Sequence, residues 1–377
     1  MSRDHLAVIA GVGTSMFGKQ SATAEELVDA AVREALEDAE LEPADIDAVV
    51  IGTVFNYPGT TNRALRAAGL ARPPITTVES ACASGTLAVH LGVEAIATGR
   101  ARTVLAVGME KMSDTVRGPI PVDLTDPEAA FGMVLPGVYG MSARRYMSVH
   151  GVTPEELAFV SVKNHRNALQ NPRAQYSGDY SVQEVLDSRV IADPLTLLQC
   201  SPVSDGAAAV VLTGGAGEGK PKILSSHVES GRPWPHGDDR VWNFDLIADT
   251  SRHALAQAGL RHADIDVIEL HDAFTIGELV TLEGLGFFPE GTAGKATLEG
   301  RTLPGADLVV NPSGGLLSRG HPLGATGVAQ VAEIAWQVTG RAGGRQLARA
   351  DVGLVETMGG NVAGLSGNGC VVMAVGS

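Results

Sequence analysis

Residues 74–85 read PITTVESACASG, and in this stretch an apolar, strand-like run passes into a long Ala-rich helical pattern. We predict a strand over 74–78 and a helix over 83–99, with Cys82 in the tight connection between them. The first turn of a helix carries unpaired N–H groups and the positive end of the helix dipole, which lower the pKa of a nearby thiol. Cys82 is therefore a candidate nucleophile, and a buried structural cysteine is the alternative.

The composition limits the class of protein. The 377 residues suffice for two core-bearing domains or one duplicated unit. A formal net charge of −15, without a run of Lys and Arg, argues against a nucleic-acid partner. Three cysteines argue against a disulfide framework. Because the apolar runs are too short for a membrane span or a signal peptide, we expect a cytoplasmic protein.

The two halves of the chain carry similar patterns. Residues 44–50 (ADIDAVV) are echoed by residues 263–269 (ADIDVIE), and each segment follows an Ala-rich helical pattern. Residues 104–110 are loosely echoed by residues 352–358. This repetition predicts two similar α/β units, each a helix-covered sheet, and chance similarity between two amphipathic βα units is the alternative.

The expected elements follow from hydrophobic periodicity. Strand-like runs lie at residues 6–12, 46–54, 103–109, 223–228, 265–270, 307–310 and 352–355, and helical patterns lie at 24–40, 154–169, 274–285 and 324–340. We place the N-terminal half at residues 1–215 and the C-terminal half at residues 216–377. A less regular excursion at about 111–200 belongs to the first half and is expected to line a binding site.

Two histidines stand at expected strand–helix junctions. His271 ends the apolar run in ELHDAF (269–274), and His321 lies in the Gly-dense run NPSGGLLSRGHPLGATG (311–327) before a helix. A lone histidine is usually structural, but two such histidines in a chain with a candidate nucleophile favour a site. One imidazole can take the thiol proton and return it, and the other can stabilise developing negative charge on a carbonyl oxygen.

The excursion also carries basic residues that suit a phosphorylated ligand. Arg144, Arg145 and Lys163 are the candidates for holding it. The alternative for each of them is a solvated helix face.

Three segments together resemble the thiolase superfamily over essentially the whole chain: ESACASG (79–85), LLQCSPVSDGAAAVVL (197–212) and NPSGGLLSRGHPLGATG (311–327). Two others, HDAF (271–274) and KNHRNALQNPRAQY (163–176), point to the sterol-carrier-protein type and its bacterial and archaeal relatives. The resemblance implies an α/β fold, a five-layered α/β/α/β/α sandwich of two similar five-stranded halves, assembled as a homodimer or homotetramer. It also implies acyl-CoA or acetyl-CoA substrates, coenzyme A as part of the substrate, and neither a tightly bound cofactor nor a metal.

The resemblance also implies residue roles and an acyl-CoA C-acyltransferase activity. Cys82 would be the acylated nucleophile, and His321 its activating base and part of an oxyanion hole. His271 would be the other oxyanion-hole donor, in place of the Asn of ordinary thiolases. The N–H groups of Cys82 and Gly359 would hold the oxygen of the acylated thioester.

The sequence departs from the family pattern in its second cysteine. Thr357 stands where ordinary thiolases carry it, and Ala273 stands where sterol-carrier-type thiolases carry it. A hydroxyl is a much weaker acid than a thiol, so Thr357 is a poor replacement. One interpretation is that Cys370 substitutes, although its apolar run CVVMAV is typical of a strand.

Three other interpretations stay open. His321 or His271 handles both proton transfers, or the protein is a retro-aldol lyase that works with a small OB-fold partner. From another class, it is a weakly catalytic acyl-CoA-binding subunit of a complex. The retained Cys82 argues for covalent catalysis, because retro-aldol chemistry needs no acyl-enzyme. Cys200 is interpreted as a packing residue.

Overall fold

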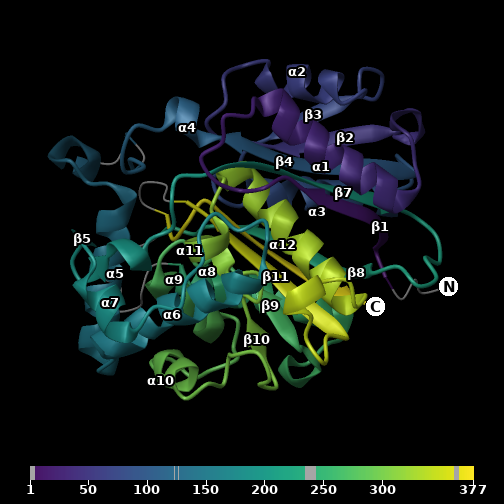
Figure 1. Ribbon diagram of the computed structural model, residues 1–377. Coiled ribbons are helices and arrows are strands. Elements are labelled where there is room, and N and C mark those ends of the chain that lie inside the picture. Colours follow the sequence, from purple (N-terminus) through teal and green to yellow (C-terminus); the bar gives the residue numbers. More distant parts are fainter. Residues whose placement is uncertain (1–4, 123, 126, 234–242, 361–364) are drawn as a thin grey trace.

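The computed structural model describes residues 5–122, 124–125, 127–233, 243–360 and 365–377 (Figure 1). The strands of its first half are β1 (Ala7–Thr14), β2 (Ala48–Gly52), β3 (Ile75–Val78), β4 (Thr103–Lys111) and β7 (Asp205–Thr213). The strands of its second half are β8 (Lys222–Ser230), β9 (Val267–Glu269), β10 (Val309–Val310), β11 (Val352–Gly359) and β12 (Gly369–Gly376). Within the described residues these strands form one 10-stranded mixed sheet in the order β10-β9-β11-β12-β8-β1-β7-β4-β2-β3.

The strand order repeats from the centre outward. In the first half β7 pairs antiparallel with β1 on one side and with β4 on the other, and β2 and β3 continue in parallel beyond β4. In the second half β8, β12 and β11 are antiparallel, and β9 and β10 continue in parallel. The halves join where Ala7 pairs with Ile223 and Val8 pairs with Lys222. The long sheet is therefore two five-stranded sheets of the same topology.

The repeated Ala-Asp-Ile-Asp segments have the same structural role in both halves. A carboxylate oxygen of Asp47 accepts the backbone N–H of Arg102 at 2.8 Å and that of Thr103 at 3.1 Å. In the second half an oxygen of Asp266 accepts the N–H of Asp351, just before β11, at 2.7 Å and that of Val352, the first residue of β11, at 3.2 Å. Each aspartate thus ties the entrance of one parallel strand to its neighbour.

Five layers result from helices on both faces of the two sheets (Figure 1). Helices α1 (Ala24–Ala39) and α2 (Thr60–Ala67) lie on the outer side of the first half. Helices α8 (Phe244–Ala258) and α9 (Thr275–Gly284) cover the outer side of the second. Helices α3 (Ser84–Ala97) and α12 (Leu323–Val338) contact strands of both halves and each other. The α/β/α/β/α sandwich expected from the sequence is confirmed.

The central position of α3 and α12 explains their composition. Val89 and Val93 of α3 and Val328 and Val331 of α12 share one core cluster with residues of the strands on either side. Surface helix α1 instead has one apolar face, and its start is fixed by a capping box in which Thr23 and Glu26 bond each other's backbone N–H. The helices expected at 24–40 and 324–340 are observed.

The excursion of the first half packs against the second half. It contains α4 (Met112–Thr115), η2 (Pro127–Phe131), α5 (Leu135–His150), α6 (Pro154–Asn167), η3 (Ala168–Gln170), α7 (Val182–Asp187), β5 (Val190–Ala192), β6 (Leu195–Thr196) and η4 (Leu197–Gln199). Helix α6 contacts α9, α10 (Ala293–Leu298) and α11 (Gly315–Arg319). Among the described residues, no helix has both the length and the apolar character needed to cross a membrane.

Candidate active site

Cys82 lies in a tight elbow between β3 and α3, where the sequence placed it. Ala81 is held in the left-handed region, with φ of 46°, a conformation that residues other than Gly rarely adopt. The hydroxyl of Ser84 donates to the carbonyl of Ala81 at 2.6 Å and accepts the N–H of Ser80 at 2.8 Å. The elbow thus presents Cys82 just before the helix, and strain at such a turn is typical of functional sites.

Small residues let the start of α12 approach this elbow. A Cβ added to Gly85 would come within 2.6 Å of the carbonyl oxygen of Gly324, and one added to Gly324 would come within 2.5 Å of that of Gly52. The two helix starts therefore meet backbone to backbone. As a result Nε2 of His321 lies 3.3 Å from Sγ of Cys82, across 239 residues of sequence.

The hydrogen bonds of His321 select its tautomer. Nδ1 lies 2.8 Å from Oγ1 of Thr326, and that hydroxyl lies 3.0 Å from the carbonyl oxygen of Pro322. The hydroxyl has one proton, which it donates to the carbonyl, so it accepts the Nδ1–H of His321. Nε2 is left as an acceptor that faces the thiol of Cys82, which is the arrangement a general base requires.

His271 completes the cluster from the end of β9. Its ring lies 5.3 Å from that of His321, at 69°. One ligand atom each of Cys82, His271 and His321 lies within 4.8 Å of the others. Nε2 of His271 is buried and has no hydrogen-bond partner among the residues that the structure describes. Since buried polar atoms are normally paired, this nitrogen is available to an atom of a ligand.

Burial keeps the reactive groups neutral. Desolvation raises the pKa of Cys82 to about 12, against the weaker lowering effect of the N–H groups of Gly360 and of Cys82 itself. Desolvation lowers the pKa of His271 to about 3 and holds that of His321 well below its usual range. The lowered thiol pKa expected from the helix start is therefore wrong for the free protein, because desolvation outweighs the helix N–H groups. The pair is a thiol and a neutral imidazole.

The two other positions considered for a second acid–base group bond different partners. Cys370 is buried in β12, where its sulfur lies 3.7 Å from a carboxylate oxygen of Glu356 and burial raises its pKa. Thr357 donates to Oε1 of Gln330 at 2.8 Å. Among the described residues, Cys370 does not join the cluster of Cys82, His271 and His321.

Backbone N–H groups also face the Cys82 sulfur. Those of Gly360 and of Cys82 itself stabilise negative charge on the sulfur. The donors expected to hold the oxygen of the acylated thioester, the N–H groups of Cys82 and Gly359, stay a prediction. Gly359 itself closes the β11–β12 ladder opposite Gly369.

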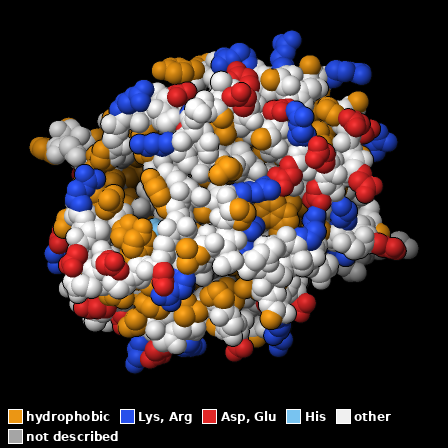
Figure 2. All heavy atoms as spheres, in the orientation of Figure 1, with side chains coloured by type: hydrophobic (Ala, Val, Ile, Leu, Met, Phe, Trp, Pro, Cys, Tyr) orange, Lys and Arg blue, Asp and Glu red, His pale blue; other side chains and the backbone are white. Residues whose placement is uncertain are grey.

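The basic residues proposed for coenzyme A have different surroundings. Lys163 is buried on α6 and forms an ion pair with Glu278 at 3.0 Å, so it is not accessible to a phosphate, and its assignment is wrong. Arg144 is exposed and pairs with Asp193, and Arg145 lies next to it on α5. On the face seen in Figure 2, Lys and Arg side chains alternate with Asp and Glu.

A buried polar network that the sequence reasoning missed supports the histidine loops. Asp272 accepts Nδ2 of Asn164 and the N–H of Leu316, both at 2.7 Å. Arg319, two residues before His321, pairs with Glu269 at 3.1 Å, two residues before His271, and so links the two histidine segments. The signal was present in the sequence, because charged residues stand inside otherwise apolar or Gly-rich motifs, and buried charges require partners.

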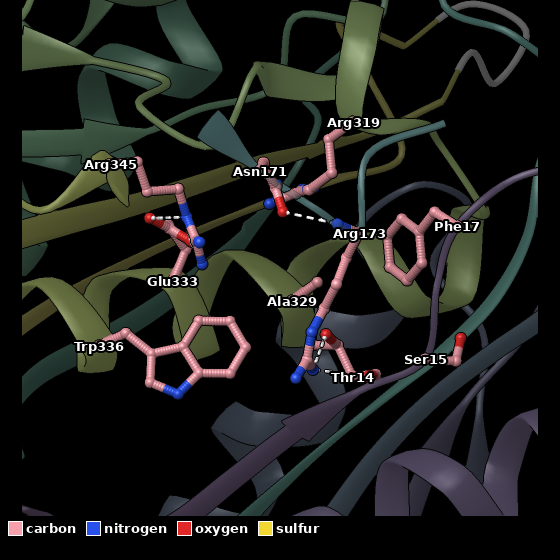
Figure 3. Close-up of a pocket in the computed structure, with 10 residues that line it drawn as sticks. All are labelled: Thr14, Ser15, Phe17, Asn171, Arg173, Arg319, Ala329, Glu333, Trp336 and Arg345. Atoms are coloured by element: carbon pink, nitrogen blue, oxygen red, sulfur yellow. Dashed lines mark hydrogen bonds and ion pairs between the residues drawn. The ribbon is translucent and has the colours of Figure 1, made fainter. Parts of the chain in front are cut away.

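Two small cavities flank this region. One of about 20 Å³ is lined by His271 together with Tyr139, Ser142, Asn243, Ile247, Ile276, Gly277, Val280, Thr281 and Met358. The other, of about 10 Å³, lies between the halves (Figure 3), and Arg173 and Arg345 flank the ring of Trp336 there. The arginines of this second cavity pair with glutamates, whereas the first cavity is lined by His271 of the thiol cluster, so the first is the candidate ligand site.

Comparisons with known proteins agree with this geometry. Residues 7–215 match the family model "Thiolase, N-terminal domain", and residues 236–366 match "Thiolase C-terminal domain-like". An "Acetyl-CoA acetyltransferase" of Methanothermobacter thermautotrophicus is 41% identical over 94% of this chain and 96% of its own length. "Benzoylsuccinyl-CoA thiolase subunit BbsB" of Thauera aromatica is 37% identical over 92% of both chains.

Two further similarities extend the range of relatives. "Sterol carrier protein 2" of Bos taurus is 37% identical over 93% of this chain and 69% of its own length. The solved structure "Ltp2-ChsH2(DUF35) aldolase" superposes with a TM-score of 0.83 at 26% identity, covering 99% of this chain and 98% of that chain.

Proposed function

The chain belongs to the thiolase family, and from this premise we propose that it is an acyl-CoA C-acyltransferase of the acetyl-CoA acetyltransferase type. The observation that carries the proposal is the 3.3 Å approach of Nε2 of His321 to Sγ of Cys82, beside the unpartnered Nε2 of His271. A nucleophile, a base with a fixed tautomer and a free polar group form the minimum set for covalent acyl transfer.

In the first half-reaction Cys82 is acylated. As Sγ attacks the thioester carbonyl of an acyl-CoA, its proton passes to Nε2 of His321. The N–H groups of Cys82 and Gly360 stabilise the negative charge on the sulfur as its proton leaves, and the N–H groups of Cys82 and Gly359 are the expected donors to the thioester oxygen. The tetrahedral intermediate collapses, the coenzyme A sulfur leaves, and His321 returns the proton to it. The product is a thioester on Cys82.

In the second half-reaction a carbon–carbon bond forms. An acyl-CoA loses a proton from its α-carbon, and the enolate attacks the Cys82 thioester, which releases the thiolate for reprotonation. Because Cys370 and Thr357 bond other groups, we assign both proton transfers to the histidines. His321 acts as base, and Nε2–H of His271 donates to the enolate oxygen. The reverse sequence is thiolytic cleavage.

The test is intact-protein mass spectrometry after incubation with acetyl-CoA and a longer acyl-CoA, followed by peptide mapping. The expected result is a mass gain of one acyl group on Cys82. The matched control is Cys82→Ala, which should bind coenzyme A and show no adduct. Unchanged turnover in that variant would overturn covalent catalysis.

A second candidate function is a retro-aldol lyase or a weakly catalytic acyl-CoA-binding subunit that works with a small OB-fold partner. The likeness to an aldolase structure favours it, as does the cluster around Cys82, which among the described residues contains no second cysteine. No adduct with either acyl-CoA, in folded protein that binds coenzyme A, would favour this candidate over the acyltransferase.

We also propose that the chain forms a homodimer or homotetramer. Strand β3 ends the sheet, and its residues are half-buried or exposed in the single chain. An open strand edge invites pairing with another chain. Sedimentation equilibrium measures the expected dimer or larger assembly.

A further inference from the structure

We infer that His227, Glu229 and His253 form a site for a divalent transition metal such as Zn²⁺ on the outer side of the second half. One ligand atom of each lies within 4.8 Å of the others. Nε2 of His227 lies 3.2 Å and Nδ1 of His253 lies 2.5 Å from the same oxygen, Oε1 of Glu229. Two imidazoles and a carboxylate are a preferred zinc set that leaves a fourth position for water.

The fold explains why these three side chains converge. His227 and Glu229 are two positions apart on β8, so they project from the same face of the strand. That face is covered by α8, which contributes His253. The rings of His227 and His253 are 4.8 Å apart and inclined at 52°. A metal here would connect a strand to the helix that covers it, and β8 is also the strand through which the halves join.

Two of the three ligand separations lie within 1 Å of those in a tetrahedral zinc site. Tetrahedral ligands about 2.05 Å from zinc lie about 3.3 Å from one another. The separation between Glu229 and His227 already has this value, and the oxygen–nitrogen pair of Glu229 and His253 must open by less than 1 Å. The side chains of His227 and His253 are 35% and 42% exposed, so an ion can reach them from solvent.

One contact opposes the metal in the free protein. Nη1 of Arg252 lies 3.1 Å from Nε2 of His253, which makes that nitrogen an acceptor and leaves the proton on Nδ1, toward Glu229. Metal binding through Nδ1 moves this proton to Nε2 and displaces the guanidinium. Arg252 is 62% exposed and also bonds Asp249, so it can turn away. Its positive charge nevertheless disfavours a second cation.

The test uses the full chain without a histidine tag, in equilibrium dialysis against Zn²⁺ with the bound metal measured by mass spectrometry. His253→Ala should weaken binding at least ~100-fold, since loss of even an indirect ligand partner costs 10- to 100-fold. Arg252→Ala should tighten binding roughly threefold by removing the competing cation. The matched control His5→Gln removes a histidine that bonds the carbonyl of Gly215, and it should change nothing.

A second measurement separates this site from the thiol cluster, which is also able to ligate a metal. Cys82→Ser should retain the zinc lost in His253→Ala. With Co²⁺, the surface site should give weak visible bands without the intense near-ultraviolet thiolate band. Zinc that survives His253→Ala and disappears with Cys82→Ser, or the absence of binding at 100 µM Zn²⁺ (roughly a Kd above 10⁻⁴ M), would overturn the inference.

Discussion

The two loops that precede the central helices occupy equivalent places in the two halves, yet they supply different chemistry. The loop before α3 has small neighbours and one thiol, at Cys82, and its shape depends on the strained Ala81. The loop before α12 supplies the imidazole of His321 and is held by buried ion pairs such as Arg319 with Glu269. The two similar halves thus provide two facing helix starts, of which one carries the nucleophile Cys82 and the other carries the base His321.

The largest expected effect on the acylation rate comes from removing the base. His321→Ala should slow acylation of Cys82 by roughly 10²- to 10⁴-fold, because a buried thiol with a pKa of about 12 cannot ionise without an acceptor. His271→Ala should leave acylation within about threefold and slow carbon–carbon bond formation by roughly 10²- to 10³-fold. Quenched-flow mass spectrometry measures the first step, and chromatography of the CoA products measures the second.

His271→Asn is the matched control for that pair, since an amide also donates a hydrogen bond. It should recover the second step to within roughly tenfold of the unaltered protein. Equal loss of acylation in both alanine variants would mean that the histidines act as one unit and that the division of labour is wrong.

The next effect concerns the ionisation of Cys82 in the free protein. Because burial raises its pKa to about 12, the rate of alkylation by iodoacetamide should rise about tenfold per pH unit from pH 7 to pH 9, without levelling. Peptide mapping follows the modification, and Cys82→Ser gives the background from Cys200. A plateau below pH 8 would show a thiolate stabilised by the helix start, as the sequence alone indicated.

A smaller effect is expected from the group that fixes the tautomer of His321. Thr326→Val keeps the shape and removes the oxygen that accepts the Nδ1–H. Acylation should slow roughly 10- to 50-fold, because the imidazole can then carry its proton on Nε2, and in that tautomer Nε2 cannot accept the proton of Cys82. Thr326→Ser retains the hydroxyl and should restore most of the rate. If both variants lose the same rate while their melting temperatures match, packing of the methyl group matters more than the hydrogen bond.

Much of the fold and part of the site followed from the sequence. Hydrophobic periodicity and the repeated Ala-Asp-Ile-Asp segments predicted two similar halves, because equivalent strands and helices of the two halves bury equivalent apolar faces. The three residues Cys82, His271 and His321 stood out because strand–helix junctions place polar side chains at sheet ends, and the structure brings them together. What escaped prediction depends on burial, which a local pattern does not contain.

Lys163 and Cys82 illustrate that limit. Lys163 stands in a helical segment of mixed polarity and was interpreted as a phosphate ligand, but the second half covers it and Glu278 neutralises it. The pKa of Cys82 was expected to fall, but residues far away in the sequence exclude water from it. Local sequence predicts which groups are present, and only the packing of both halves determines their charge.

The smallest expected effect compares the two repeated aspartates directly. Asp266 is 3% exposed and accepts two backbone N–H groups, so Asp266→Ala leaves buried donors unpaired and should lower the free energy of unfolding by ~2 kcal/mol. Asp47 makes the same bonds near the surface, where water replaces them, and Asp47→Ala should cost only ~0.5 kcal/mol. Urea unfolding of both variants at pH 7 measures the difference.

The pH dependence sharpens this last comparison. The N–H of Arg102 lowers the pKa of Asp47 in the folded chain below its value of about 3.9 in the unfolded chain. The contribution of Asp47 to stability is therefore fully present above the pKa of the unfolded chain. It is lost as the pH falls through the lower pKa of the folded chain, where the carboxylate takes up a proton. The small difference between Asp47→Ala and the unaltered protein should shrink toward zero at acid pH. A difference that persists there would mean that the side chain stabilises the turn through packing, and the two halves would then use their shared aspartate for different reasons.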